Sequence, residues 1–161
     1  MTKQSRPGGY GRRTYTVAEE WTASGHMTLS RIATFLDEAT DAFRDDLRLG
    51  AVYSREHRRQ MFVADTHIRF VSEIKEGDTI RTETRLVALA RNRLHLMHEI
   101  HRNDMSQPAT IGEMLIVHVD MDTRRACAIP DERLEALQAL LDEQRGEVLT
   151  SSPGMRVSVQ R

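Results

Sequence analysis

The sequence predicts an α+β domain in which an antiparallel β-sheet of about five strands packs against one long central α-helix. Two observations support this prediction: apolar residues recur at helical spacing over roughly residues 28–50, and four strand-like segments then follow without another long helix between them. One helix covers only a strip of such a sheet. We therefore expect a second copy of the chain to pair with an edge or a face of the sheet.

The first two elements are a strand at Thr14–Trp21 and the long helix. Thr28 is a favourable N-cap residue for this helix, and Gly50 is a favourable residue just after its end. Charged residues interleave with an apolar stripe, as in a helix with one buried face. The stripe consists of Leu29, Ile32, Phe35 or Leu36, Ala39, Phe43 and Leu47.

Four further strands and a second helix complete the predicted domain. Turn residues separate strands at Phe62–Val71, Thr79–Leu89, Arg93–Arg102 and Ala109–Met121. The last strand is apolar on both faces, which is typical of a central strand. Pro130 then begins a short helix that runs through Gln144. We expect residues 1–13 to form a disordered leader, 14–144 one domain, and 145–161 a flexible tail.

Composition excludes several classes of function. The 161 residues are enough for one domain, and 23 Lys and Arg against 24 Asp and Glu provide no basic field for nucleic acid. Cys127 is the single cysteine, so no internal disulfide or CxxC zinc pair is possible, and a reducing, cytoplasmic setting fits. No apolar run reaches the length of a signal peptide or a membrane span, so we expect no membrane partner.

Five segments together resemble a known family. They are Glu20–Met27 with the following helix, Asp65–Ile68, Lys75–Asp78, Arg93–His98 and Glu113–Asp120. This set resembles the 4-hydroxybenzoyl-CoA thioesterase-like superfamily of hot-dog proteins over most of residues 15–125. The resemblance implies a hot-dog fold, with the sheet wrapped around the helix. It also implies an acyl-CoA thioesterase that works as a homodimer or homotetramer, with its site at a subunit interface and coenzyme A only as part of the substrate.

Two shorter pieces, His26–Arg31 and Arg125–Cys127, resemble the betainyl-CoA thioesterase type of bacterial carnitine degradation. This resemblance implies a small acyl-CoA substrate such as betainyl-CoA. A quaternary ammonium group in the substrate calls for aromatic contacts. Trp21, Phe62 and Phe70 are the candidates by placement, although core packing also explains the two phenylalanines.

Thioester hydrolysis requires a donor for the developing oxyanion and a carboxylate that attacks or activates water. The first turn of a helix offers free backbone N–H groups, and Gly25 allows the sharp turn that leads into it. By resemblance, the oxyanion donor is the backbone N–H near Leu29. Thr22 occupies the position where one type of family member has a catalytic aspartate, and a hydroxyl cannot replace a carboxylate directly.

Three other residues are candidates for the missing acid–base group. A second branch of the family has its carboxylate about two helical turns after the oxyanion donor, and Asp37 occupies that position here. A solvent-exposed helix face is the alternative explanation for Asp37. Asp65 is the next option, although it also fits a surface ladder with His67 or Arg69. His26 is able to orient water or the thioester oxygen, or it simply packs near the helix start.

Two arginine clusters are candidates for contact with the phosphates of coenzyme A, although charge runs are more often solvated surface. The first comprises Arg55, Arg58 and Arg59, and the second Arg91 and Arg93. We expect no metal from the series His95, His98 and His101. In a strand the middle histidine points to the opposite face from the other two, so His98 is predicted to be a core residue with a hydrogen-bond partner.

Two alternative functions remain open at this level. Thr22 in place of a carboxylate is consistent with a non-catalytic hot-dog protein that binds acyl-CoA for regulation. His26 with Asp37 resembles the pair that hydratases or dehydratases use on the same fold. Assays with acyl-CoA and enoyl-CoA esters separate these possibilities.

Overall fold

The computed structural model describes residues 10–145, so most of the expected leader and nearly all of the expected tail lie outside the described residues. The elements in chain order are β1 (Tyr10–Thr16), a 3₁₀ helix (Glu19–Trp21), β2 (Thr22–Ala23), β3 (His26–Met27), α1 (Leu29–Asp46), α2 (Ala51–His57), β4 (Arg59–Phe70), β5 (Thr79–Ala90), β6 (Arg93–Arg102), β7 (Thr110–Asp120), β8 (Arg125–Ala126) and α3 (Asp131–Gln144). Among the described residues, no helix is long and apolar enough to cross a membrane.

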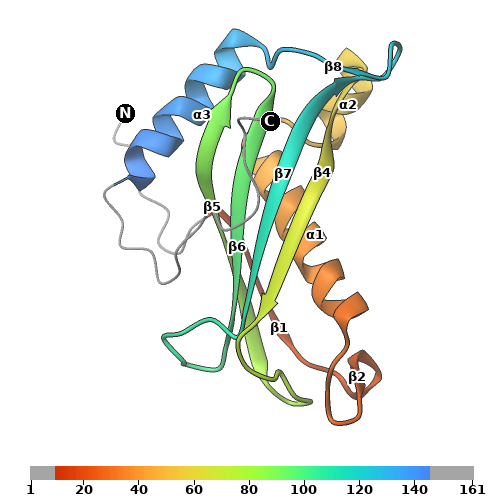
Figure 1. Cartoon of the computed structure of the whole chain (residues 1–161), viewed down its shortest axis with the longest axis vertical. Coiled ribbons are helices and arrows are strands. Elements are labelled where there is room, and N and C mark those ends of the chain that lie inside the picture. Colours follow the sequence, from red (N-terminus) through yellow and green to blue (C-terminus); the bar gives the residue numbers. More distant parts are fainter. Residues whose placement is uncertain (1–9, 146–161) are drawn as a thin grey trace.

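The main sheet is antiparallel, with the strand order β1-β5-β6-β7-β4 and the short β8 beside β7. It curls around α1, which runs behind it in Figure 1 and emerges beside β4 with its N-terminal half. The prediction of an α+β, hot-dog-like sheet of about five strands on one long helix is confirmed. The predicted central strand, β7, lies between β6 and β4 and is buried over most of its length.

The core lies between α1 and the concave face of the sheet. Seven residues of α1 are buried, and all but Thr40 and Ala42 belong to the predicted apolar stripe. Leu29, predicted as the first residue of this stripe, is instead 60% exposed, since it is the first residue of the helix. The helix approaches β7 closely at Gly112, where an added Cβ would lie 2.8 Å from Leu36 Cδ1. A residue without a side chain at this position lets the helix pack directly onto the sheet.

The C-terminal end of α1 differs from the prediction. The helix ends at Asp46, and Arg48 takes the left-handed conformation with φ +55°. Arg48 N donates to Asp45 O (3.0 Å) and Leu49 N to Arg44 O (2.8 Å), a Schellman motif that satisfies two terminal carbonyls. The buried Leu49 side chain holds this motif in place, so the helix ends before Gly50.

Gly50 instead precedes α2, a short helix that the sequence analysis did not predict. Its backbone lies against the Asp45 side chain, and a Cβ at Gly50 would overlap that carboxylate. The first strand also differs, because β1 begins at Tyr10 and ends at Thr16 instead of spanning Thr14–Trp21. The chain leaves the sheet at Val17, whose N–H donates to Asp78 O (2.9 Å), and then forms the 3₁₀ turn.

Candidate active site

A tight hairpin positions the start of α1. Its strands are β2 and β3, and its turn residues Ser24 and Gly25 both have positive φ (52° and 84°), as two-residue hairpin turns require. The exit from the hairpin is held by Met27 N, which donates to Ile74 O (2.7 Å), and by Thr28 N, which donates to Trp21 O (3.0 Å). The predicted turn into the helix is therefore a small, backbone-bonded structure.

The first turn of α1 leaves two backbone donors free. The Thr28 hydroxyl accepts from Arg31 N (3.4 Å), as predicted for an N-cap, and Thr28 O accepts from Ile32 N (3.0 Å). For the N–H groups of Leu29 and Ser30, the described part of the chain provides no acceptor. With the positive end of the helix dipole, these two donors form a place where negative charge is stabilised.

A cavity of about 470 Å³ opens beside these donors. It is unusually apolar for an exposed part of the molecule, since Leu29, Phe70 and Val71 are 60%, 54% and 53% exposed. A short acyl chain fits a cavity of this size and character. The lining residues are His26, Met27, Leu29, Ile32, Phe70, Val71, Ser72, Glu73 and Ile74.

Two of the predicted catalytic residues, His26 and Leu29, line this cavity, and both are exposed. Thr22 lies next to it in the hairpin, opposite Met27, but its hydroxyl donates to Glu19 O (2.8 Å) and so closes the 3₁₀ turn. The sequence did not single out Glu73, which is the one carboxylate of the lining. Glu73 precedes the Lys75–Asp78 turn and belongs to no sequence motif that indicates a catalytic or binding residue.

Asp37 and Asp65 lie outside this lining. Near the end of α1, Arg44 Nη1 donates to Met61 O, which lies near the start of β4 (2.7 Å). At the start of α1, Leu29 lines the same cavity as Phe70, the last residue of β4. The helix and this edge strand therefore run in opposite directions. Asp37 lies near the middle of α1 and Asp65 near the middle of β4, so both lie halfway along the same side of the molecule.

The five arginines predicted to contact phosphate lie at the opposite end of the molecule, around α2 and the β5–β6 turn (Figure 1). Arg93 Nε lies 3.3 Å from Asn92 Oδ1. Three of the other four arginines have carboxylate partners in the chain: Arg58 with Asp122 (2.7 Å), Arg59 with Asp120 (2.8 Å) and Arg91 with Asp131 (3.2 Å). None of these arginines is among the residues that line the cavity at the start of α1.

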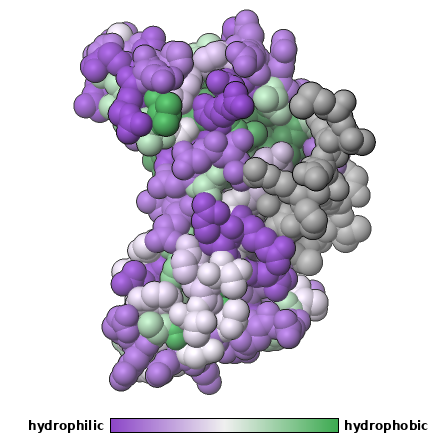
Figure 2. Space-filling model, turned by 180° about the vertical axis from the view of Figure 1, so that it is seen from behind, coloured by the Kyte–Doolittle hydropathy of each residue, from purple (hydrophilic) through white to green (hydrophobic). Residues whose placement is uncertain are grey.

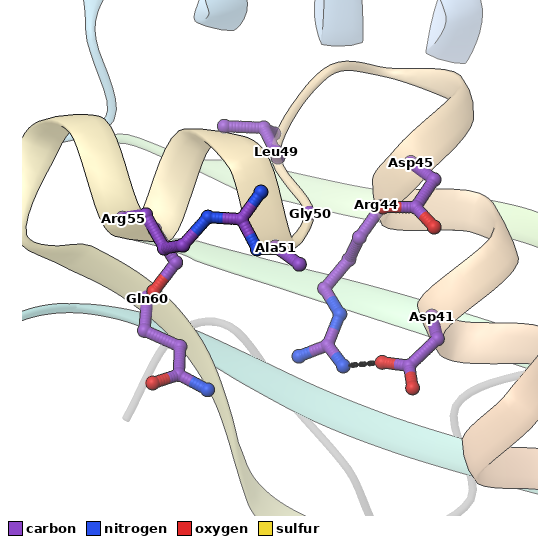
Figure 3. Close-up of a pocket in the computed structure, with 9 residues that line it drawn as sticks. Asp41, Arg44, Asp45, Leu49, Gly50, Ala51, Arg55 and Gln60 are labelled. Atoms are coloured by element: carbon purple, nitrogen blue, oxygen red, sulfur yellow. Dashed lines mark ion pairs between the residues drawn. The ribbon is translucent and has the colours of Figure 1, made fainter.

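Arg55 points into a second cavity, of about 450 Å³, between the end of α1, the start of α2 and β4 (Figure 3). Arg44 lines the same cavity and forms an ion pair with Asp41. Burial lowers the pKa of the Arg44 guanidinium, and the nearby charges of Asp37 and Asp45 oppose this shift. Among the described residues, the Arg55 side chain has no hydrogen-bond or ion-pair partner. It is therefore the predicted arginine that remains available to an anionic ligand.

The three histidines of β6 do not converge. His98 is fully buried toward α1, where its Nδ1 lies 2.9 Å from the Thr84 hydroxyl and its Nε2 3.0 Å from the Thr40 hydroxyl. The prediction of a hydrogen-bonded core histidine is confirmed. On the other face, His95 pairs with Glu113 (2.8 Å) and His101 with Glu99 (3.0 Å).

The described residues contain one group with metal-ligand geometry: Glu83, Glu99 and His101 each offer an atom within 4.8 Å of the others. Arg81 Nε lies 3.2 Å from Glu83 Oε1 and already neutralises part of its charge. The group lies on the outer face of the sheet, whereas the cavity lies at the start of α1. It therefore takes no part in chemistry at that cavity.

Of the three aromatic candidates for contact with a quaternary ammonium, only one lines the cavity. Trp21 packs on Phe35 (5.2 Å between ring centroids), and the Arg31 guanidinium lies over its ring at 5.3 Å. Phe62 is half-buried and does not line the cavity. Phe70 does line it, and it is the aromatic residue with an exposed ring there.

Comparison with known proteins identifies the family to which this geometry belongs. Residues 18–137 match the model of the thioesterase-like superfamily, and this match covers most of the chain. The chain belongs to the thioesterase-like superfamily. Its solved neighbours share the fold: a hypothetical protein from Staphylococcus aureus in complex with CoA has a TM-score of 0.81 at 19% identity and covers 94% of this chain and 96% of that one. DHNA-CoA thioesterase from Staphylococcus aureus has a TM-score of 0.73 at 19% identity, with 87% and 97% covered.

Two proteins with similar sequences have names that include betainyl-CoA thioesterase. An L-carnitine dehydrogenase/betainyl-CoA thioesterase from Agrobacterium fabrum is 37% identical over 76% of this chain, which spans only 25% of that longer protein. A betainyl-CoA thioesterase from Pseudomonas aeruginosa is 27% identical, with 80% of this chain and 82% of the relative covered.

Proposed function

We propose that the protein is an acyl-CoA thioesterase that hydrolyses a small acyl-CoA to the free acid and coenzyme A. One observation carries the proposal: Leu29, whose N–H group and that of the adjacent Ser30 find no acceptor among residues 10–145, lines an apolar cavity at the start of α1. These donors stabilise the oxyanion that forms when water attacks the thioester carbonyl. Membership of the thioesterase-like superfamily and the names of the relatives support the same chemistry.

Asp37 is the proposed general base. It is exposed and lies two turns after Leu29, about 12 Å further along the helix axis. Helical side chains lean toward the N-terminus, which brings the carboxylate closer to the cavity and leaves room for an attacking water. In this scheme His26 orients the thioester oxygen or the water from the lining. The thiolate of coenzyme A leaves after the tetrahedral intermediate collapses, and a proton reaches it from solvent.

We further propose that the working enzyme is a homodimer, or a homotetramer built from such dimers. The edge strand β4 is 12 residues long, so Arg59 and Phe70 at its two ends lie roughly 36 Å apart. The arm of coenzyme A is too short to join the cavity to the arginines of the same chain. Antiparallel pairing of two β4 edges would bring Arg55, Arg58 and Arg59 of one copy close to the cavity of the other.

The surface has the shape that this arrangement needs. Figure 2 shows a deep indentation on the side that carries β4 and α1, between the end with α2 and the end with β2 and β3. Phe70 and Val63, two apolar residues of β4, are exposed on this strand. Pairing of β4 edges would cover the exposed Val63 side chain, which does not line the cavity, and would place Asp37 and Asp65 near the twofold axis.

For the acyl group we propose betainyl-CoA, after the names of the relatives. The test is release of free thiol from a panel of acyl-CoA esters that includes betainyl-CoA. We expect Asp37→Asn to lower kcat by roughly 10²- to 10⁴-fold. Glu38→Gln, the neighbouring exposed carboxylate of α1, lines neither cavity and is the matched control that should keep the rate. Full activity of Asp37→Asn would move the base to Asp65.

Two alternative functions make different predictions in the same assays. A non-catalytic regulatory protein would bind acyl-CoA without releasing thiol above background. A hydratase or dehydratase would change the absorbance of an enoyl-CoA ester, and Asp37→Asn would abolish that change. We also propose a cytoplasmic location, because Cys127 has no second cysteine with which to form a disulfide within the chain.

A further inference from the structure

We propose that the cavity at the start of α1 selects a cationic acyl group, with the Glu73 carboxylate and the Phe70 ring as the residues that recognise a quaternary ammonium. This inference rests on the thioesterase function proposed above. It assigns the acyl specificity to two residues that have no part in the hydrolysis itself. The preference for a positively charged acyl group can therefore be removed by substitution without loss of thioester hydrolysis.

The charge of the lining supports a cationic ligand. Of the nine lining residues, Glu73 is the one carboxylate, and neither lysine nor arginine is among them. His26 is the remaining titratable side chain of the lining. An acyl group that carries a carboxylate would be repelled here, whereas a fixed positive charge would be attracted.

The rest of the lining suits a cation that has no N–H group. A quaternary ammonium cannot donate hydrogen bonds through N–H, so it binds through a carboxylate, aromatic faces and apolar contacts. Phe70 is 54% exposed and lines the cavity. Three apolar side chains, Met27, Leu29 and Ile32, provide surface for the methyl groups.

Glu73 already attracts a cation of the chain itself. Lys75 Nζ lies 3.5 Å from Glu73 Oε2, and both side chains are well exposed. Exposed pairs of this kind contribute little, so a substrate ammonium is able to replace Lys75. Lys75 does not line the cavity. It acts in this scheme as a weak competitor for Glu73.

The two polar features of the cavity match the two ends of such a substrate. The N–H groups of Leu29 and Ser30 attract the developing negative charge on the carbonyl oxygen, and Glu73 attracts positive charge. In a betainyl thioester, the trimethylammonium nitrogen is attached to the carbon next to the carbonyl. Opposite charges therefore lie close together in the transition state, and groups that complement both charges, Glu73 and the start of α1, belong to one cavity.

The test compares betainyl-CoA with 3,3-dimethylbutanoyl-CoA, in which a carbon atom replaces the nitrogen and only the charge differs. The readout is the ratio of the two kcat/KM values, because contributions from the coenzyme A part cancel. The ammonium also activates the neighbouring carbonyl, so the ratio is divided by the ratio of the two spontaneous hydrolysis rates. We expect the wild-type protein to prefer the cationic ester about tenfold after this division, the combined size of one exposed charge pair and one cation–π contact.

Four variants assign this preference to residues. Glu73→Gln should lower the ratio about fivefold, and Phe70→Leu should lower it about threefold. Lys75→Gln removes the competitor and should raise the ratio. Glu76→Gln, an exposed carboxylate in the same loop but outside the lining, is the matched control and should leave the ratio unchanged.

A wild-type kcat/KM ratio no larger than the ratio of the spontaneous hydrolysis rates would overturn the inference and leave the thioesterase function standing. A Glu73→Gln variant that loses the same factor on both esters would also overturn it, since Glu73 would then act on the part that the esters share. If neither ester is hydrolysed, the thioesterase function falls. Both esters then persist in solution, and the ratio of their dissociation constants tests the charge preference directly.

Discussion

His98 allows the contact between α1 and the sheet to be tested through the pH dependence of stability. The side chain is fully buried, and burial lowers the pKa of its imidazole to about 3. The Thr40 hydroxyl donates to Leu36 O (2.9 Å), so it accepts from His98 Nε2, and His98 Nδ1 accepts from Thr84. The neutral ring satisfies both hydroxyl groups, whereas a protonated ring would carry an unpaired charge in the core.

The magnitude follows from the two pKa values. An unfolded chain binds a proton at His98 near pH 6.5, while the folded chain does not do so until about pH 3. Stability is therefore fully present above pH 6.5 and is lost as the pH falls, at about 1.4 kcal/mol per pH unit. Between pH 7.5 and pH 5.0, His98 alone should lower the free energy of unfolding by about 2 kcal/mol.

Urea unfolding at several pH values from 7.5 to 5.0 measures this loss, and His98→Gln removes the titrating group. The variant will be less stable at every pH, so the comparison uses the change with pH within each protein. Burial also lowers the pKa of His118, but that contribution is present in both proteins and cancels. An equal loss of stability in wild type and variant would refute the argument that His98 is held neutral in the core.

Two further substitutions test how the start of α1 is positioned. Gly112→Ala should cost about 1–3 kcal/mol in urea unfolding, because its Cβ would press on Leu36 and push the helix from the sheet; an unchanged midpoint would show that the contact relaxes freely. Thr28→Ala removes the hydroxyl that caps Arg31 N and should cost about 1 kcal/mol, with a lower kcat for acyl-CoA. Thr28→Ser is its control, since it keeps the hydroxyl and should retain both properties.

The main elements were predictable because each leaves a local signal. The spacing of Ile32, Phe35, Ala39 and Phe43 marks the buried face of α1, and β6 was predicted with its observed bounds, Arg93–Arg102. The N-cap at Thr28 was readable for the same reason, because a cap depends on neighbours three residues away. The sequence by itself therefore determined the fold class, the order of the strands along the chain and the position of the helix start.

The tertiary structure decided what no local pattern records. Arg48 ends α1 early because the buried Leu49 side chain anchors the terminal motif, a contact that residue spacing does not show. Glu73 and Phe70 meet at one cavity because the end of β4 and the loop after it pass beside the start of α1. Their proximity depends on how the helix crosses the curled sheet, which many residues determine together. From the sequence, Phe70 was therefore only one of three aromatic candidates, and Glu73 was not a candidate, although the start of α1 was predictable.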